Sequence, residues 1–199
     1  MYCLYAKDKK NVLVVFAGVF TGVVLCLLKV FFTFGHRVVP FDLTQNFMHY
    51  LIKETLLPSV LVYGVYAVVL RDKFTYKLNI AFPLLAAFYA IYMPYCVIGV
   101  TDSIYSAYNL FIKPTLYGAM TGIFAQSLSL CSKMVCEKKK MYFITLVLLG
   151  IGVSLVFPAI SQAMYDINIH YTMNMLLSGV FIATALIWPV LKVIKYIKE

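Results

Sequence analysis

Two lysines lie within long apolar segments of this sequence, where an ionisable side chain is unusual. Lys29 and Lys113 each fall toward one end of their segment, so each ammonium group can extend to the level of the lipid headgroups. The alternative is that one of them faces a cavity and binds an anionic group or a partner's carboxylate. The carboxylates Glu54 and Asp102 fall at the edges of apolar segments. We therefore expect no acidic side chain within a span, which disfavours proton-coupled transport.

The sequence contains no recognisable catalytic motif. A Gly-x-Ser-x-Gly elbow, a His-Glu-x-x-His zinc helix and a phosphate-binding glycine loop are all absent. The 5 cysteines are dispersed, and the Cys131/Cys136 pair lacks the two further ligands of a zinc site. The histidines His36, His49 and His170 are scattered. We expect no enzymatic activity, no metal site and no cofactor.

Tyrosines gather near the ends of two neighbouring apolar segments. Such residues usually form a belt at the membrane interface, because the ring is buried while the hydroxyl stays in water. The alternative is a ligand pocket with aromatic walls on the outer side. Its candidate residues are Tyr89, Tyr92, Tyr95, Tyr105, Tyr108 and Lys113.

The composition indicates that lipid is the solvent for most of this chain. Of 199 residues, 63% are hydrophobic and 13% are charged, and the mean hydropathy is +0.88. A soluble fold of this size could not keep so much apolar surface away from water. A basic leader over residues 1–10 precedes an apolar segment that is longer than a signal-peptide core and has no small-residue cleavage site. That first segment is therefore expected to be a permanent span.

Apolar segments of sufficient length recur along the chain and predict its fold. We expect an all-α, polytopic integral membrane bundle of six transmembrane helices in a single domain, 1–199. The spans are expected at about 11–34, 55–70, 78–100, 105–130, 141–160 and 171–193. The second span is the shortest and contains Pro58. An amphipathic helix lying on the outer membrane surface is expected over about 41–53, where apolar residues recur at helical spacing.

The distribution of basic residues supports the same count. With both termini in the cytosol, the outer segments contain Arg37 and Lys53. The cytosolic segments contain a much larger set: Lys7, Lys9, Lys10, Arg71, Lys73, Lys77, Lys133, Lys138, Lys139, Lys140, Lys192, Lys195 and Lys198. The positive-inside rule thus favours six spans with both ends inside, and a bacterial inner membrane is the expected location.

This basic inner face is a candidate docking surface for an acidic cytosolic protein. The residues proposed to bind the partner are Arg71, Lys73, Lys77, Lys133, Lys138, Lys139 and Lys140. The alternative is that these residues set the topology and attract anionic lipid headgroups. Direct binding of nucleic acid is not expected, because no group for base recognition accompanies the charge.

Two Gly-x-x-x-Gly pairs, Gly18/Gly22 and Gly118/Gly122, lie in the first and fourth expected spans. Small residues one turn apart let membrane helices approach closely. The contact is either internal to one subunit or an interface of a homo-oligomer. Both pairs read Gly-x-x-Thr-Gly, which hints at the inverted repeats found in many transporters.

Together these features favour a non-enzymatic, oligomeric membrane subunit that senses the state of the membrane or envelope and anchors or regulates a cytosolic partner. In general design (a short basic leader with Lys7, Lys9 and Lys10, compact spans and a basic inner surface) the chain resembles the small membrane subunits of two-component bacterial anti-phage systems such as Kiwa. That resemblance implies a cytosolic effector as partner. The alternative is a small-molecule transport component, either a small channel or a substrate-binding subunit similar to those of energy-coupling-factor transporters.

Overall fold

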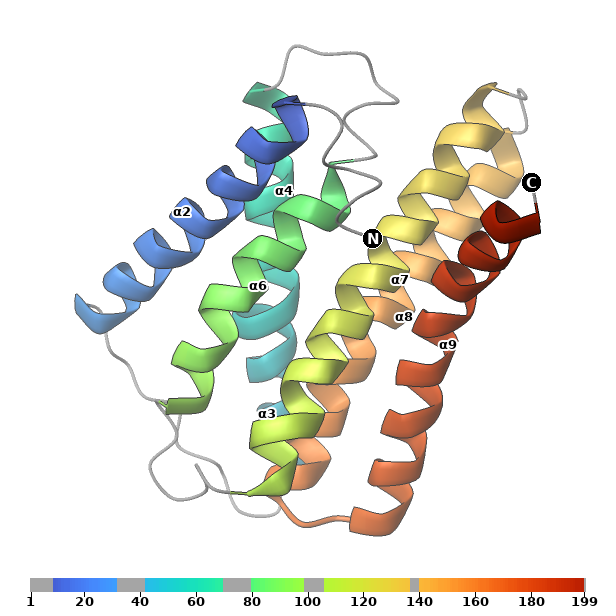
Figure 1. The fold of residues 1–199 in the computed structure, drawn as a ribbon. Helices are drawn as coiled ribbons and strands as arrows, with labels where there is room; N and C mark the ends of the chain where they lie inside the picture. Colours follow the sequence, from blue (N-terminus) through green and yellow to red (C-terminus); the bar gives the residue numbers. More distant parts are fainter. Residues whose placement is uncertain (1–8, 32–41, 70–79, 99–105, 137–139, 199) are drawn as a thin grey trace.

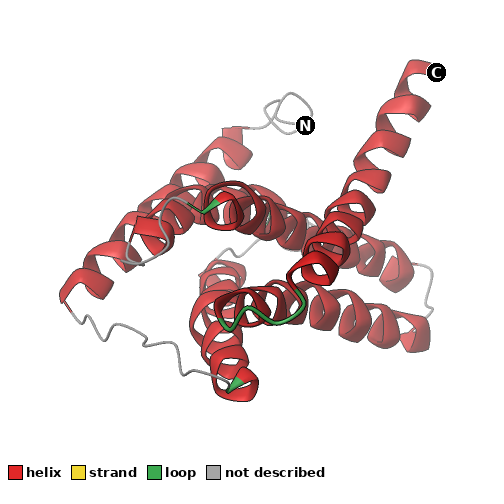
Figure 2. Ribbon diagram, turned by 90° about the horizontal axis from the view of Figure 1, so that it is seen from below, coloured by secondary structure: helices red, strands yellow, loops and turns green. Residues whose placement is uncertain are grey.

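The computed structural model describes residues 9–31, 42–69, 80–98, 106–136 and 140–198, and the regular structure within them is entirely helical (Figure 2). The prediction of an all-α fold is confirmed for this part of the chain. The elements are α2 (Lys9–Phe31), α3 (Leu43–Tyr50), η1 (Leu51–Leu56), α4 (Leu57–Val69), α6 (Ala81–Ile98), η2 (Tyr108–Ile112), α7 (Lys113–Cys136), α8 (Lys140–Asp166) and α9 (Tyr171–Lys198), of which η1 and η2 are π-helical.

The described helices alternate in direction along the chain (Figure 1). The elements α3, η1 and α4 are continuous, as are η2 and α7. The starts of α2, α6 and α8 and the ends of α4, α7 and α9 lie at one end of the bundle (Figure 1). The first and last described helices therefore have their chain-terminal ends on the same side.

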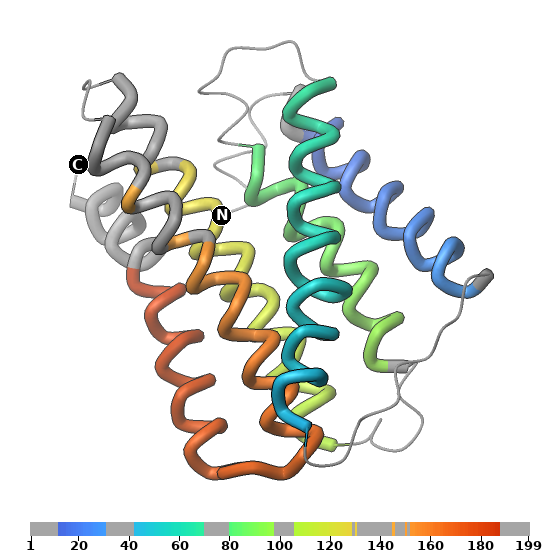
Figure 3. The backbone as a smooth tube through the Cα atoms, turned by 180° about the vertical axis from the view of Figure 1, so that it is seen from behind, coloured from blue at the N-terminus to red at the C-terminus, as the bar shows by residue number. Residues whose placement is uncertain are grey.

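The helices form two groups that meet along α6 and α7. Helix α2 packs along α6, while α7, α8 and α9 pack against one another. The long α3–η1–α4 helix changes its neighbour along its length. Its first part, α3 and η1, lies against α8, and its last part, α4, lies against α6 (Figure 3). The turn η1 is thus located where the two groups come together.

The largest apolar core surrounds α6. Leu84, Phe88 and Tyr92 are fully buried there, and they pack with buried residues of α2, α4, α7 and α8. A second cluster joins the start of α7 with α9 through residues such as Leu116 and Phe181. Van der Waals contacts between these large side chains favour packing between the helices.

Two helices of the described residues are long and apolar enough to cross a membrane: Val12–Val30 and Leu43–Val69. Within their most apolar windows only 17% and 28% of residues are buried in the bundle, whereas the core helix of a soluble protein would be mostly buried. Ala81–Val97 and Tyr171–Ile187 are shorter apolar helices. These segments support association with a membrane, and the six-span arrangement stays a prediction.

The structure joins two segments that the sequence separated. Residues 41–53, expected as a surface helix, are continuous with the second span in a single helix of 27 residues, Leu43–Val69. Asp42 caps its start by accepting a hydrogen bond from the Gln45 amide at 2.9 Å. Pro58 does not end this helix, because the preceding π-helical turn already replaces the α-helical hydrogen bonds. Glu54 consequently lies in the middle of the helix and is not at its edge.

Candidate functional site

Glu54 and Lys113 form an ion pair in the interior of the bundle. The Lys113 Nζ lies 3.1 Å from Glu54 Oε2, and the two residues are 1% and 8% exposed. Tyr117 donates its hydroxyl to the same carboxylate oxygen at 3.0 Å. The Lys113 ammonium also lies 5.5 Å from the centroid of the Tyr50 ring. Lys113 is therefore enclosed by the protein, and the carboxylate that it binds belongs to its own chain.

Both charged residues of this central ion pair lie at π-helical turns that are followed by a proline: Glu54 lies within η1, before Pro58, and Lys113 directly follows η2, before Pro114. The Leu57 amide donates to the Ile52 carbonyl just before Pro58, and the Lys113 amide donates to the Tyr108 carbonyl just before Pro114. A proline has no amide proton, so carbonyls one turn earlier lose their usual donor. Single π-helical turns within α-helices are frequent at functional sites. Each of the two charged residues is thus located by the same local feature, a π-helical turn followed by a proline.

Two tyrosines of α6 satisfy the carbonyls that Pro58 leaves without a helical donor. The Tyr89 hydroxyl donates to the Glu54 carbonyl at 3.1 Å. The Tyr92 hydroxyl donates to the Lys53 carbonyl at 3.3 Å. Helix α6 therefore binds the backbone of η1, while α7 binds the Glu54 carboxylate. The elements η1, α6 and α7 therefore all make hydrogen bonds at Glu54.

A second carboxylate, Asp166 at the end of α8, lies close to the central ion pair. It accepts hydrogen bonds from the Tyr50 hydroxyl and from Gln162 Nε2, the latter at 2.8 Å. Burial raises the pKa of Asp166 above its usual range, although these donors and the nearby Lys113 act in the opposite direction. Because the Lys113 ammonium lies over the Tyr50 ring and the Tyr50 hydroxyl binds Asp166, Tyr50 lies between the lysine of the central ion pair and this second carboxylate.

A separate polar cluster joins η2, α8 and α9. The Ser161 hydroxyl lies 2.7 Å from the Tyr108 hydroxyl and donates to Asn174 Oδ1 at 2.8 Å. Asn174 returns a hydrogen bond from Nδ2 to the Ser161 carbonyl at 2.9 Å, and Ser178 lies 3.1 Å from the Ser161 hydroxyl. Hydrogen bonds between small polar residues hold helices together where apolar surroundings offer no other partner.

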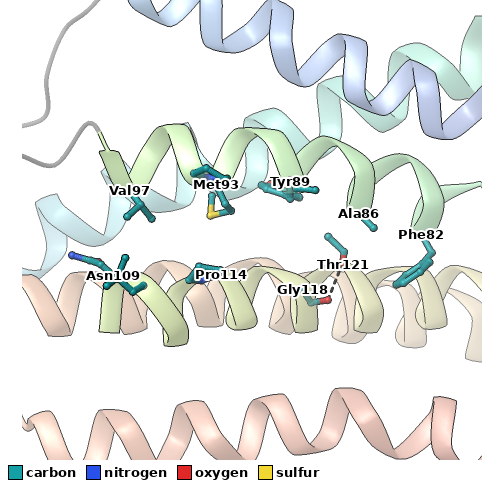
Figure 4. A pocket seen from close by; sticks show the side chains of 12 residues that line it. Phe82, Ala86, Tyr89, Met93, Val97, Asn109, Pro114, Gly118 and Thr121 are labelled. Carbon is teal, nitrogen blue, oxygen red and sulfur yellow. Dashed lines mark hydrogen bonds between the residues drawn. The ribbon is translucent and has the colours of Figure 1, made fainter. Parts of the chain in front are cut away.

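An apolar groove lies between the facing sides of α6 and α7, beside the central ion pair (Figure 4). Its volume is about 530 Å³. Its lining consists of Phe82, Ala86, Tyr89, Ala90, Met93, Pro94 and Val97 from α6, Asn109 and Leu110 from η2, and Pro114, Gly118 and Thr121 from α7.

The candidate pocket residues from the sequence are distributed over several environments. Tyr89 lines the groove, whereas Tyr92 and Tyr108 are fully buried in the core. Tyr95 is half-buried against the main core, and Tyr105 lies outside the described residues. The second lysine within a span, Lys29, is half-buried with its ammonium 4.7 Å from the centroid of the Tyr92 ring. The structure thus brings Tyr89 and Lys113 together at Glu54, since Tyr89 binds its carbonyl and Lys113 its carboxylate.

The glycine pairs occupy contrasting positions. Gly18 and Gly22 are buried against α6, while Gly118 and Gly122 have open space where a side chain would project.

Most of the candidate docking residues fall outside the part of the chain that the structure describes. Arg71, Lys73, Lys77, Lys138 and Lys139 lie outside the described residues, and Lys133 and Lys140 belong to the end of α7 and the start of α8, with side chains that are not described.

Sequence reasoning missed the acidic half of this site. Glu54 was expected at the edge of a span, and Tyr50, Tyr117 and Asp166 were given no role. One signal in the sequence connects the two charges, since Glu54 lies four residues before Pro58 and Lys113 directly before Pro114. A proline in an apolar helix frees backbone carbonyls that need polar partners.

Fold and site together define an all-helical bundle with an internal ion pair and a lateral apolar groove. No group of three or more histidine, cysteine, aspartate or glutamate side chains suited to a metal ion occurs among the described residues. No protein-family model matches the chain, and no curated protein or solved structure matches it either. The function is therefore argued from the site itself.

Proposed function

We propose that this chain is a non-enzymatic integral membrane subunit whose central ion pair sets the arrangement of its helices and whose basic inner face binds a cytosolic protein. The observation that carries the proposal is the Glu54–Lys113 pair, buried where the two helix groups meet. Ionisable side chains at membrane depth are costly and usually serve a function. Here the two charges bind each other and nearby tyrosines, which suits a regulatory contact better than a catalytic one.

The proposed topology is six spans with both termini in the cytosol. The described helices alternate in direction, and the starting end of α2 and the final end of α9 lie on the same side (Figure 1). Large apolar side chains cover the outer surfaces, for example Phe16 and Phe20 on α2, Val68 on α4 and Leu176 on α9, each at least 67% exposed. Such surfaces are stable in lipid and unstable in water.

The central ion pair is proposed to specify one of two arrangements of the bundle. A well-packed pair of apolar residues would stabilise the interior as well as a buried ion pair does, or better. The contribution of the pair is therefore to select which residues of η1, α6 and α7 face one another. A stimulus that alters the bilayer around α6 and α7 changes this contact, and that is the proposed sensing step.

Helix α7 connects the central ion pair to the proposed docking face. Lys113 is its first residue, and Lys133 lies twenty residues later near its cytosolic end, about 30 Å away at the rise of an α-helix. A rigid helix that shifts at one end also shifts at the other. The partner is proposed to be an acidic cytosolic protein, and the resemblance to the membrane subunits of anti-phage systems makes a defence effector its proposed class.

Charge reversal tests the docking face. Lys138→Glu, Lys139→Glu and Lys140→Glu together are expected to release a cytosolic protein that co-purifies stoichiometrically with the native chain. A matched control reverses Lys192, Lys195 and Lys198, the same number of cytosolic lysines at the end of the chain, and is expected to retain the partner. Retention of the partner by the first variant, with unchanged topology, would show that this loop is not the docking site.

A transport component is the second candidate function, and Glu54 favours it specifically. The expected lack of acids within the spans was the main argument against coupled transport, yet Glu54 lies inside the bundle next to a groove. Vesicles reconstituted with the chain and loaded with a pH-sensitive dye would reveal proton flux under an imposed potential. Flux that disappears in Glu54→Gln would support transport, whereas no flux together with a co-purifying cytosolic protein would reject it.

A further inference from the structure

The groove between α6 and α7 opens sideways from the bundle. Of its lining residues, Ala90, Pro94, Leu110 and Gly118 are exposed, and they come from both walls. Ala90 and Gly118 at this opening are small, and a Cβ added at Gly118 would meet no atom within 4 Å. In a protein that spans a bilayer, an opening at this position faces lipid.

Both hydroxyl groups on the walls are already engaged within the protein, and the third polar side chain of the lining, Asn109, is only 1% exposed. The Tyr89 hydroxyl lies 2.8 Å from the Ser59 hydroxyl and also donates to the Glu54 carbonyl, so only its ring faces the groove. The Thr121 hydroxyl donates to the Gly118 carbonyl at 2.8 Å. A polar ligand would lose its hydrogen bonds to water without replacing them, which costs several kcal/mol. The lining therefore selects an apolar occupant.

The volume of the groove decides between a second helix and a flexible chain. A helix about 10 Å across and four turns long would fill on the order of 1700 Å³, about three times the roughly 530 Å³ of the groove. A whole helix of a second copy is too large to be enclosed by the groove. A single hydrocarbon chain is narrow, and small-ligand sites commonly measure about 300–1,000 Å³.

We propose that this groove binds one acyl chain of a membrane phospholipid. The proposal rests on the membrane insertion argued above and adds a ligand to that function. The bound chain contacts the Tyr89 ring and Pro114, and these residues adjoin the Glu54 carbonyl and Lys113. Occupancy of the groove therefore acts directly on the two elements that carry the central ion pair. The bound acyl chain is then the ligand to which the sensing step responds.

Native mass spectrometry of the detergent-purified chain, after reconstitution with phosphatidylethanolamine and phosphatidylglycerol, tests the proposal. The native chain is expected to retain one phospholipid, and Gly118→Leu is expected to lose it. Gly179→Leu is the matched control, because Gly179 on α9 also has open space around it but lies outside the groove. Retention of the lipid by Gly118→Leu, or no retained lipid on the native chain, would overturn the proposal.

Fluorescence quenching locates the chain without altering Gly118. In a Trp188→Phe background, Leu110→Trp reports on the groove and Leu176→Trp reports on the outer face of α9. With phosphatidylcholine vesicles that contain increasing amounts of brominated acyl chains, quenching at Leu110→Trp is expected to saturate at a low brominated fraction. Quenching at Leu176→Trp is expected to follow the bulk lipid composition. Identical, proportional curves at both positions would overturn the proposal.

Two further outcomes separate this inference from the function on which it rests. Extraction of the chain from membranes by alkaline carbonate would contradict the proposed membrane insertion itself. If the chain is integral but Gly118→Leu abolishes a homo-oligomer and leaves lipid retention unchanged, the groove is an interface between copies and the acyl-chain proposal is wrong.

Discussion

The two sides of α6 meet their neighbouring helices in opposite ways, although the same five-residue pattern faces each of them. On one side, Gly18 and Gly22 of α2 lie so close that a side-chain carbon at Gly18 would be 2.4 Å from the Leu84 carbonyl. On the other side, a side-chain carbon at Gly118 or Gly122 of α7 would meet nothing within 4 Å. The α2–α6 contact is tight and apolar, while the α6–α7 contact contains a groove.

This difference shows that the Gly-x-x-Thr-Gly motif alone does not predict whether two helices pack closely. The glycines permit close approach, but the residues of the opposing helix decide whether it happens. Toward α2, helix α6 presents its own backbone together with the side chains of Ala87 and Ile91. Toward α7 it presents Tyr89, whose ring and hydroxyl are held in place by Ser59 and η1. This tyrosine lines the groove, so the second contact contains a bulky, fixed side chain on the side of α6.

The largest effect is expected on the α7 side, from removal of one charge. Lys113→Met leaves the Glu54 carboxylate buried without its cation, and the free energy of unfolding should fall by about 3–5 kcal/mol. Unfolding by sodium dodecyl sulfate in mixed micelles measures this change. The double variant Lys113→Met/Glu54→Met should recover most of the loss, because no uncompensated charge remains.

Lys29→Met is the control for removing a lysine from an apolar helix. Its ammonium lies over the Tyr92 ring, an interaction that contributes about 0.5–1 kcal/mol at partly exposed sites, so the loss should be much smaller. Equal losses for Lys113→Met and the double variant would show that the charges are not coupled and that the central ion pair does not organise this side of α6.

An intermediate effect is expected on the tight side. Gly18→Ala places a carbon against the backbone of α6, which cannot move without separating the helices, and overpacking of this kind costs about 1–3 kcal/mol. The same unfolding titration measures it. Gly64→Ala on α4, where a side chain would meet nothing within 4 Å, controls for the loss of a helical glycine. If Gly18→Ala is as stable as Gly64→Ala, the close approach of α2 and α6 is contradicted.

The smallest effect, and one of opposite sign, is expected at the groove. Gly118→Ala adds a carbon to open space and removes the conformational freedom of glycine in a helix, which should stabilise the bundle by about 0.5–1 kcal/mol. Thermal unfolding in detergent should show a small increase in Tm. A decrease would mean that this glycine is packed against a neighbour, and the contrast between the two sides of α6 would disappear.

Local properties of the chain were sufficient to predict most helices. The expected spans at 11–34, 78–100 and 171–193 overlap α2, α6 and α9 closely, because uninterrupted apolar character favours a helix wherever water is excluded. The division between the expected surface helix at 41–53 and the span at 55–70 did not match the structure. Two polar residues, Lys53 and Glu54, and then Pro58 made that segment resemble a boundary, and local hydropathy cannot show that a polar side chain has a partner elsewhere.

The amino-acid sequence by itself determined that this protein is helical, strongly apolar and basic at one predicted face, since these properties depend on composition and on short-range periodicity. The tertiary structure alone decided which charged residues are buried within the bundle and which glycines are covered by a neighbouring helix. Glu54 and Lys113 are separated by more than fifty residues, and so are Gly18 and the Leu84 carbonyl that it approaches. A buried charge is stable only beside its counter-charge, and a glycine is covered only where the opposing helix approaches it closely. Both conditions depend on residues that the fold, and not the local sequence, brings together.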